Sequence, residues 1–279
     1  MKRPILVPVC ATALLSWLLA ARTASATPQP LPFTYVYETL PKGSLELEQY
    51  ADYTPIRVQN TGGGSFIYGA SQFQTEFEYG ITNRLELGVY LTFAPNPPGA
   101  ALDPNPILTE GNGVKERLRL RLFDEGVLPI DLGLYGELTE NDHEFEIEAK
   151  ILLQRRFGNL RIAANIVGEH EWYYESPQQD WIFDPSAGIT YQVTPVFHPG
   201  IDSWMWIEHT NNYNYSTPGP LPLNLRPNVY VGPAILLDFG KFWWSTGAYL
   251  RVTSFDHTMV AGQDSFGAVW FRMMVGISF

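Results

Sequence analysis

The chain has 279 residues, with 29 acidic residues against 18 basic ones and a single cysteine, Cys10. This acidic balance argues against nucleic acid as a partner. One cysteine excludes a disulfide scaffold and cysteine-based metal or redox chemistry. After residue 26 no run approaches the roughly 18 consecutive apolar residues that a membrane helix needs, which excludes a helical membrane protein.

The first 26 residues have the organisation of a secretory signal peptide. Lys2 and Arg3 precede an apolar run from about residue 5 to residue 20, and Ala24-Ser25-Ala26 provides small residues for cleavage. Cleavage would leave 15 of the 18 basic residues against 29 acidic ones, a formal charge of −14. We therefore expect an exported protein whose mature chain begins near Thr27.

Apolar and polar residues alternate along most of the exported chain, most clearly from Phe73 to Tyr79 and from Leu85 to Phe93. Such segments form strands with one apolar and one polar face. Their lengths are close to the roughly 9 to 11 residues with which a tilted strand crosses a hydrocarbon layer. The expected strands are 44–53, 66–79, 84–94, 114–123, 129–139, 143–155, 159–169, 186–195, 200–210, 228–239, 241–252 and 267–279.

The connections between these strands alternate between short and long. Short turns are expected near 80–83, 124–128, 157–158, 195–199 and 239–240, and longer loops near 54–65, 95–113, 170–185, 211–227 and 253–266. Only the turn at 140–142 is short where a long loop is due. Bacterial barrels have short periplasmic turns and long extracellular loops, whereas a soluble sandwich has no reason to sort its loops this way. The sequence therefore predicts an all-β, antiparallel transmembrane barrel of about twelve strands with periplasmic termini.

The end of the chain resembles the terminal strand of bacterial outer-membrane barrels. One face of this strand would carry Val269, Phe271, Met273, Val275, Ile277 and Phe279. Such barrels commonly end in Phe, which their assembly machinery reads. The resemblance implies a bacterial outer-membrane location, contact of the apolar face with outer-membrane lipids, and recognition of Phe279 by the assembly machinery.

Two stretches near the start of the mature chain carry a more specific resemblance. Tyr35-Val36-Tyr37-Glu38-Thr39-Leu40-Pro41-Lys42-Gly43, continued by Leu45 to Gln49, and Phe77 to Leu87 are similar to a family of largely uncharacterised proteobacterial outer-membrane barrels. That family is distantly like transporters assigned to a meta-pathway of phenol degradation. The resemblance covers about the first quarter of the mature chain. It implies a twelve-stranded barrel that takes up small or hydrophobic compounds, and it transfers no binding residues.

The chain is expected to have one folded domain in three parts: a signal peptide at 1–26, an N-terminal segment at 27–42 and the barrel at 43–279. Pro28, Pro30, Pro32 and Pro41 exclude a regular ladder throughout the N-terminal segment, because proline has no backbone N–H to donate. This segment is either a periplasmic tail or a plug in the mouth of the barrel.

If the apolar faces contact lipid, rows of charged residues face the lumen. The predicted pore-lining residues are Glu76, Glu78, Glu86, Lys115, Arg117, Arg119, Arg121, Glu137, Glu144, Glu146 and Glu148. Glu86 and Glu137 are the expected partners of the basic row, because confined charges must be paired. The rows either form a salt-bridge lattice that fills the barrel or border a wet pore that orients polar solutes. A barrel of about twelve strands lies between the filled and the open cases.

Aromatic residues near the loop ends of strands predict an interfacial girdle, formed by Trp172, Tyr173, Tyr174, Trp181, Trp204, Trp206, Tyr213 and Tyr215. Strand parity predicts that another set faces inward and lines a cleft for a small aromatic or hydrophobic ligand. That set is Tyr90, Tyr135, Trp206, Tyr230, Trp243, Tyr249 and Trp270.

One segment offers an enzymatic alternative. His209-Thr210-Asn211-Asn212 resembles the His-x-Ser-Asn element of outer-membrane lipid hydrolases, but Asn211 stands at the nucleophile position and an amide cannot replace an activated hydroxyl. The five histidines have no metal-ligand spacing.

The sequence thus predicts no catalytic residue, metal or cofactor. It predicts a channel or transporter for a small-molecule solute, hydrophobic or aromatic compounds included. The alternatives are a closed barrel that serves structure or surface interactions and, third, a lipid-modifying hydrolase.

Overall fold

The computed structural model describes residues 26–59, 65–94, 112–216, 221, 225–253 and 267–279, so most of the predicted signal peptide lies outside the described residues. Within these ranges the chain is all-β, and no helix there has the length and hydropathy to cross a membrane. The strands are β1 (Leu45–Gln59), β2 (Ser65–Gly80), β3 (Leu85–Phe93), β4 (Gly113–Arg121), β5 (Asp131–Asn141), β6 (Glu144–Phe157), β7 (Leu160–Tyr173), β8 (Gln179–Phe183), β9 (Ser186–Tyr191), β10 (Phe197–Thr210), β11 (Asn228–Asp238), β12 (Phe242–Arg251) and β13 (Val269–Ser278).

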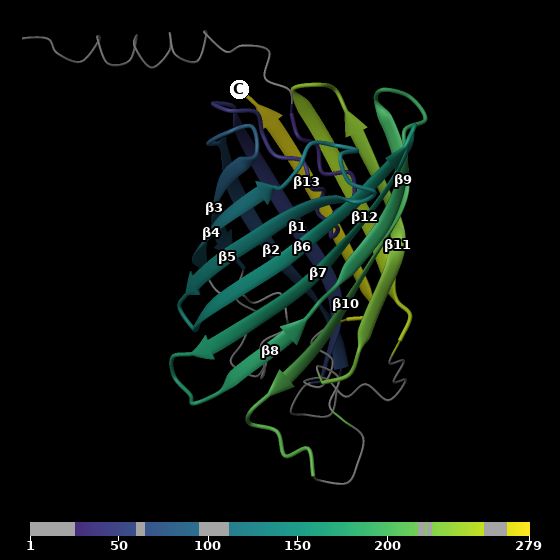
Figure 1. The fold of residues 1–279 in the computed structure, drawn as a ribbon. Coiled ribbons are helices and arrows are strands. Elements are labelled where there is room, and N and C mark those ends of the chain that lie inside the picture. The colour runs from purple at the N-terminus through teal and green to yellow at the C-terminus, as the bar shows by residue number, and fades with distance from the viewer. Residues whose placement is uncertain (1–25, 60–64, 95–111, 217–220, 222–224, 254–266) are drawn as a thin grey trace, which may run out of the picture.

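The strands form one closed antiparallel barrel with 12 strand positions (Figure 1). The barrel closes because β1 pairs with β2 on one side and with β13 on the other. β8 and β9 share one position between β7 and β10. The break between them falls at Asp184 and Pro185, where proline cannot donate to the ladder. The predicted all-β barrel of about twelve strands is therefore confirmed.

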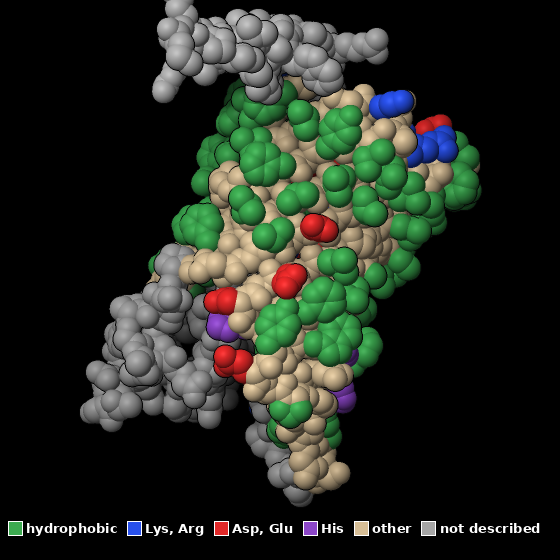
Figure 2. All heavy atoms as spheres, turned by 90° about the vertical axis from the view of Figure 1, so that its left-hand side faces the viewer, with side chains coloured by type: hydrophobic (Ala, Val, Ile, Leu, Met, Phe, Trp, Pro, Cys, Tyr) green, Lys and Arg blue, Asp and Glu red, His purple; other side chains and the backbone are tan. Residues whose placement is uncertain are grey.

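Alternate side chains along each strand point out of and into the barrel, as the period of two requires. Leu91 on β3 and Leu118 on β4 are 50% and 49% exposed, whereas Arg117, next to Leu118 in the chain, is 1% exposed. The face in Figure 2 is covered mainly by apolar side chains, with few charged groups among them. The charged rows therefore face the interior, and the apolar rows form an outer surface of the kind that membrane barrels present to lipid.

Two stretches predicted as loops are partly strand, and those predictions were wrong. β7 runs to Tyr173 and β8 begins at Gln179, which leaves only 174–178 of the predicted loop at 170–185 as a turn. The ladder continues because Glu171 pairs with Asp180 and Trp172 with Gln179. β1 likewise runs on to Gln59. The remaining long loops lie largely outside the described residues, at 60–64, 95–111, 217–220, 222–224 and 254–266.

The short turns and the C-terminus share one end of the barrel, here called the short-turn end, and the opposite end is the loop end (Figure 1). At the short-turn end the Gly43 N–H donates to the Gly80 carbonyl over 2.7 Å, and the Phe279 N–H donates to the Leu45 carbonyl over 2.9 Å. The predicted turns near 80–83, 157–158 and 239–240 are all present there within a residue or two. The chain thus enters and leaves the barrel at the same end.

Residues 26–44, here called the luminal segment, form no strand, and all but the exposed end at 41–44 lies inside the barrel. Leu31, Val36, Tyr37 and Leu40 are each at most 1% exposed. The segment starts at the short-turn end, where the Thr27 N–H donates to Glu46, and returns to that end, where the Lys42 N–H donates to Asn83. It is therefore a loop folded into the barrel from the short-turn end.

Candidate functional site

Arg117 on β4 is the centre of a buried charge cluster in the wall of the barrel. Its Nε lies 2.5 Å from Glu76 and its Nη1 lies 2.7 Å from Glu86, while Nη2 contacts Glu78. Arg119 adds a second contact to Glu86, at 2.6 Å. We call these five residues the Arg117 cluster. Each of the three buried carboxylates thus contacts at least one guanidinium group, as buried charges require, although Glu78 Oε2 and Arg119 Nε have no hydrogen-bond partner among the described residues.

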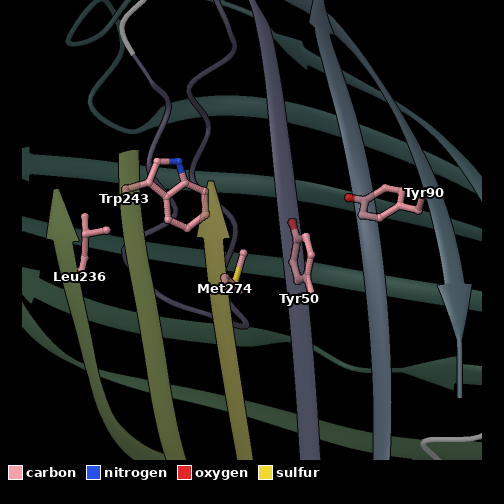
Figure 3. Packing of buried hydrophobic residues seen from close by; sticks show 5 residues of the cluster. All are labelled: Tyr50, Tyr90, Leu236, Trp243 and Met274. Carbon is pink, nitrogen blue, oxygen red and sulfur yellow. The ribbon is translucent and has the colours of Figure 1, made fainter. Parts of the chain in front are cut away.

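The shape of the wall makes room for this cluster. Gly88 lies opposite Arg117 in the β3–β4 register, and a Cβ atom built on Gly88 would come within 2.6 Å of Arg117 Nε. Tyr90 accepts a hydrogen bond from Arg117 Nε over 2.9 Å, and Tyr50 donates to Glu76 over 2.9 Å. Figure 3 shows Tyr50 and Tyr90 in the same wall as Trp243. This part of the lumen is therefore filled by interlocked side chains.

The predicted pore-lining residues all come from strands of the barrel, but they fall into three groups. Lys115 pairs with Glu137 at 3.4 Å and Arg119 with Glu86, so the expected partners of the basic row are in place. Arg121 lies apart, because it ends β4 at the short-turn end and reaches the Asn83 carbonyl and Asp124. Glu144, Glu146 and Glu148 on β6 are buried on the inner face towards the loop end.

Asp202 on β10 holds the innermost part of the luminal segment. Its carboxylate accepts hydrogen bonds from the Phe33 N–H over 2.9 Å and the Thr34 hydroxyl over 2.6 Å. Asn165 on β7 adds two more bonds, accepting from the Tyr35 N–H over 2.6 Å and donating to the Tyr35 carbonyl over 3.0 Å. These wall side chains satisfy backbone groups that the segment, having no ladder of its own, would otherwise bury unpaired.

The ring of Phe33 is packed among aromatic side chains of the wall. It stacks on Trp204 with 4.6 Å between ring centroids and meets Tyr249 edge-on at 5.0 Å. The guanidinium carbon of Arg272 lies 3.8 Å from the Phe33 ring centroid. The girdle assignment of Trp204 was therefore wrong. Trp204 is 6% exposed and faces the lumen, because the inward face of β10 carries Asp202 and Trp204.

The girdle assignments of Tyr173 and Trp206 were also wrong, because the Tyr173 hydroxyl donates to the buried Glu171 over 2.7 Å and Trp206 lines the lumen. Other aromatic residues lie on the face predicted for them. Tyr90, Tyr135, Tyr230, Trp243, Tyr249 and Trp270 are each at most 5% exposed on the inner face, and Trp206 lines a luminal cavity. Trp181 and Tyr174 are 60% and 54% exposed near the loop end, as a girdle requires. His209 is exposed and stacks on Tyr215 with 4.5 Å between centroids, so it faces away from the lumen.

Glu38 connects the C-terminal half of the luminal segment to β6 and β7. Its Oε1 atom lies 3.0 Å from Arg156 and 3.1 Å from Arg161, and it accepts a hydrogen bond from Gln154 over 3.0 Å. Burial by itself would raise the pKa of Glu38. Arg161, the Gln154 amide and Arg156 outweigh burial and hold the pKa below its usual value.

Replacing Glu38 by Gln is expected to destabilise the protein by about 1 kcal/mol at neutral pH. Because the folded pKa is lowered, the stabilisation from Glu38 is present above the unfolded pKa and is lost as the pH falls through the folded pKa. The difference in unfolding free energy between wild type and Glu38→Gln, measured by urea titration, should therefore shrink below about pH 4. A difference that stays constant down to pH 3 would contradict the assigned role of Arg156 and Arg161.

A cavity of about 130 Å³ lies in the lumen beyond the tip of the luminal segment. Phe33 and Tyr35 of the segment line it, together with wall side chains of β1 to β7, β9, β10 and β13. Its lining includes the aromatic residues Tyr50, Tyr90, Tyr135, Trp204, Trp206 and Trp270 and the charged residues Lys115, Glu137, Glu146, Glu148, Lys150, Glu169, Asp184 and Arg272. A concave site with an aromatic lining and a few charged groups is typical of small-molecule binding.

Carboxylates gather on the β5–β7 side of this cavity. Glu137 lies directly opposite Glu148, Glu148 opposite Glu169, and Glu146 opposite Glu171 in the strand registers. Two groups, Glu137/Glu146/Glu148 and Glu144/Glu146/Glu171, have carboxylate oxygens within 4.8 Å of one another, a spacing that could hold a cation. The side of the lumen that carries most of the carboxylates therefore borders the cavity, across from the side that carries Trp204, Trp206 and Trp270.

Several residues of this site were not singled out by sequence reasoning. Asp202 and Asn165 were missed because their partners lie in the luminal segment, 169 and 130 residues away for the bonds to Phe33 and Tyr35. Lys150 and Glu169 follow the same inward parity as Glu148, which is the signal that could have found them. Trp204 lies two residues before Trp206, so both side chains are expected on the same face of the strand. Trp204 was nevertheless predicted only in the outer girdle.

The fold is that of outer-membrane β-barrels. The crystal structure of the COG4313 outer membrane channel from Pseudomonas putida F1 matches 87% of this chain and 98% of its own, with a TM-score of 0.56 and 13% identity. The NanC porin structure matches 83% of this chain and 98% of its own, with a TM-score of 0.54 and 10% identity. At these identities the likeness establishes the fold alone.

A family of unknown function (DUF6662) matches residues 23–117. The match spans the luminal segment, β1 to β3 and β4 as far as Arg117. No curated protein sequence matches the chain. The predicted similarity to an uncharacterised barrel family is thus supported at the level of a family without assigned function. The link to a phenol-degradation pathway remains a prediction.

Proposed function

We propose that the protein is an outer-membrane channel for small solutes, closed at rest by the luminal segment. The apolar outer surface suits the lipid of the outer membrane, and the shared position of both chain ends and the short turns suits a periplasmic short-turn end. The fold-level likeness to an outer membrane channel and to a porin agrees with this proposal. Assembly through the C-terminal Phe279 and contact with outer-membrane lipids belong to the same proposal.

The observation that carries the proposal is that the lumen is occupied by residues that form no strand. The luminal segment is held by side-chain contacts to Asp202, Asn165 and Glu86 and not by a strand ladder. It can therefore move without unpairing any strand of the barrel. The cavity beyond its tip would then become continuous with the space that the segment leaves.

The second candidate is a closed barrel whose interior serves stability only, and the Arg117 cluster favours it. Arg117, Glu76 and Glu86 are each at most 1% exposed, so this part of the wall leaves no room for solvent. The two candidates differ in what happens when the luminal segment is removed. A filled barrel stays closed, whereas a plugged channel opens.

The test is the conductance of refolded mature protein in planar bilayers, compared with a variant that lacks residues 27–40. We expect rare, small openings from the intact protein and steady, several-fold larger currents from the deletion variant. The heat-dependent gel mobility of folded barrels controls for folding and insertion. Silence from both proteins in a folded, inserted state would refute the channel, and equal currents would refute closure by the luminal segment.

A further inference from the structure

We propose that the luminal cavity binds a small organic cation, an ammonium group carried on a body the size of one aromatic ring. The proposal rests on the proposed function as far as transport is concerned, because it names the class of solute that the channel would take. The binding site itself is inferred from the cavity and does not depend on transport. Four features of the cavity lead to it: its size and aromatic lining, its charge, the position of Lys150 and the indole N–H of Trp204.

The size and lining of the cavity suit a single ring. A volume of about 130 Å³ is close to that of the roughly 150 Å³ apolar cavity that takes up benzene. Phe33 and Tyr35 of the luminal segment and Tyr135 and Trp204 of the wall line the cavity with aromatic rings. Such a lining removes the apolar body of a ligand from water.

The charge of the lining selects a cation. Five carboxylates line the cavity, from Glu137, Glu146, Glu148, Glu169 and Asp184, against the three cations of Lys115, Lys150 and Arg272. Arg272 is already held by Asp52, with Nε 2.7 Å from Oδ1 and Nη2 2.9 Å from Oδ2. Like charges placed directly opposite each other, as in the pair Glu148 and Glu169, destabilise a sheet. A bound cation would relieve this repulsion.

Lys150 shows how this lumen holds an ammonium group. Its Nζ atom lies 4.8 Å from the ring centroid of Tyr35 and 4.8 Å from that of Tyr135, and it contacts the carboxylate of Glu148. Two aromatic faces and a carboxylate are the elements that recognise organic ammonium ions. Residues of the same two kinds, the carboxylates Glu146 and Glu169 and the aromatic Trp206, also line the cavity.

The side chain of Trp204 points independently to a ligand. Trp204 is 6% exposed, lines the cavity, and has an indole N–H without a hydrogen-bond partner among the described residues. A buried donor of this kind is costly unless something accepts from it. The ammonium group itself only donates, so an acceptor elsewhere on the ligand, or a water molecule brought in with it, would satisfy the indole.

The experiment is a calorimetric titration of the folded mature protein in detergent with three compounds that share a phenyl ring. They are 2-phenylethylamine, which is cationic, 2-phenylethanol, which is neutral, and 3-phenylpropionate, which is anionic. We expect the amine to bind at least about tenfold more tightly than the alcohol, and the anion not to bind. Glu146→Gln and Glu169→Gln should each weaken amine binding by about tenfold and leave the alcohol unchanged.

Glu116→Gln is the matched control, because Glu116 is exposed on the outer face of β4, and it should change neither affinity. Equal affinity for amine and alcohol would overturn the inference, as would amine binding that survives the double variant Glu146→Gln/Glu169→Gln. Conductance is recorded separately. A channel that conducts but binds the amine no better than the alcohol refutes the cation site alone. Amine binding without conductance keeps the cation site and refutes the channel.

Discussion

Replacing Arg117 by Met is expected to destabilise the barrel by roughly 3 to 5 kcal/mol, which is enough to prevent efficient refolding. The substitution leaves the carboxylates of Glu76, Glu78 and Glu86 in a buried wall with only Arg119 to compensate them. Removing one member of a buried charge network costs more than the network contributes, because the remaining charges cannot recover their hydration. Urea-dependent folding into lipid vesicles, followed by tryptophan fluorescence and gel mobility, measures the effect.

Arg84→Met is the matched control for this prediction. Arg84 forms an ion pair with Asp124 at 2.8 Å, but the two side chains are 48% and 59% exposed, so its loss should have a small effect. Adding Glu76→Gln and Glu78→Gln to Arg117→Met should recover part of the stability, because the uncompensated charges are removed. If Arg117→Met were no more harmful than Arg84→Met, the Arg117 cluster would have to be hydrated and not a sealed part of the wall.

Replacing Asp202 by Ala is expected to release the tip of the luminal segment and to raise the conductance of the proposed channel severalfold. Asp202 is fully buried and accepts hydrogen bonds from Phe33, Thr34 and the Tyr249 hydroxyl. Each donor left unpaired in a buried site costs about 1 to 3 kcal/mol, so the segment loses much of the free energy that holds it in place. The barrel ladder is untouched, because Asp202 is held in the strand by backbone pairing with Gly188 and Gly232.

The release can be measured without recording currents. Cys10 is the one cysteine of the chain and lies in the predicted signal peptide, so Val36→Cys places a single thiol in the mature protein. Val36 is 1% exposed, and its replacement thiol should react slowly with a soluble maleimide in the parent protein and many times faster with Asp202→Ala added. Asp142→Ala, on the exposed 142–143 turn, should leave the rate unchanged. Unchanged labelling in Asp202→Ala would show that other contacts hold the segment.

The barrel could be predicted from the sequence because membrane strands carry their information locally. The alternation from Leu85 to Phe93 and the basic row on β4 determine which side chains face inward, and adjacent strands then bring Glu86 to Arg119 and Glu137 to Lys115. Side chains two residues apart must share a face, and antiparallel neighbours joined by a short turn have little freedom of register. These constraints are enough to recognise the barrel and most of its inner wall.

Prediction of the inward and outward faces failed where the alternation of apolar and polar residues is interrupted. Pro195 and Pro199 flank the start of β10, so the parity of Asp202 and Trp204 could not be carried through from β9. The extension of β7 and β8 into the predicted loop at 170–185 was missed because a polar, aromatic segment is compatible with either a strand or a loop. In both places the pairing between strands decided the structure.

The sequence by itself determined a closed antiparallel barrel, its apolar outer surface and the paired charges of its wall, since these follow from a period of two and from hydrogen bonds between neighbours. Only the tertiary structure decided that residues 26–40 lie inside the barrel and that Asp202 and Asn165 hold them. It also decided that Phe33, Lys150 and the carboxylates of β5 to β7 meet around one cavity. These contacts join residues more than a hundred positions apart. The prolines of the luminal segment exclude a regular strand ladder there, but they do not indicate which residues the segment contacts.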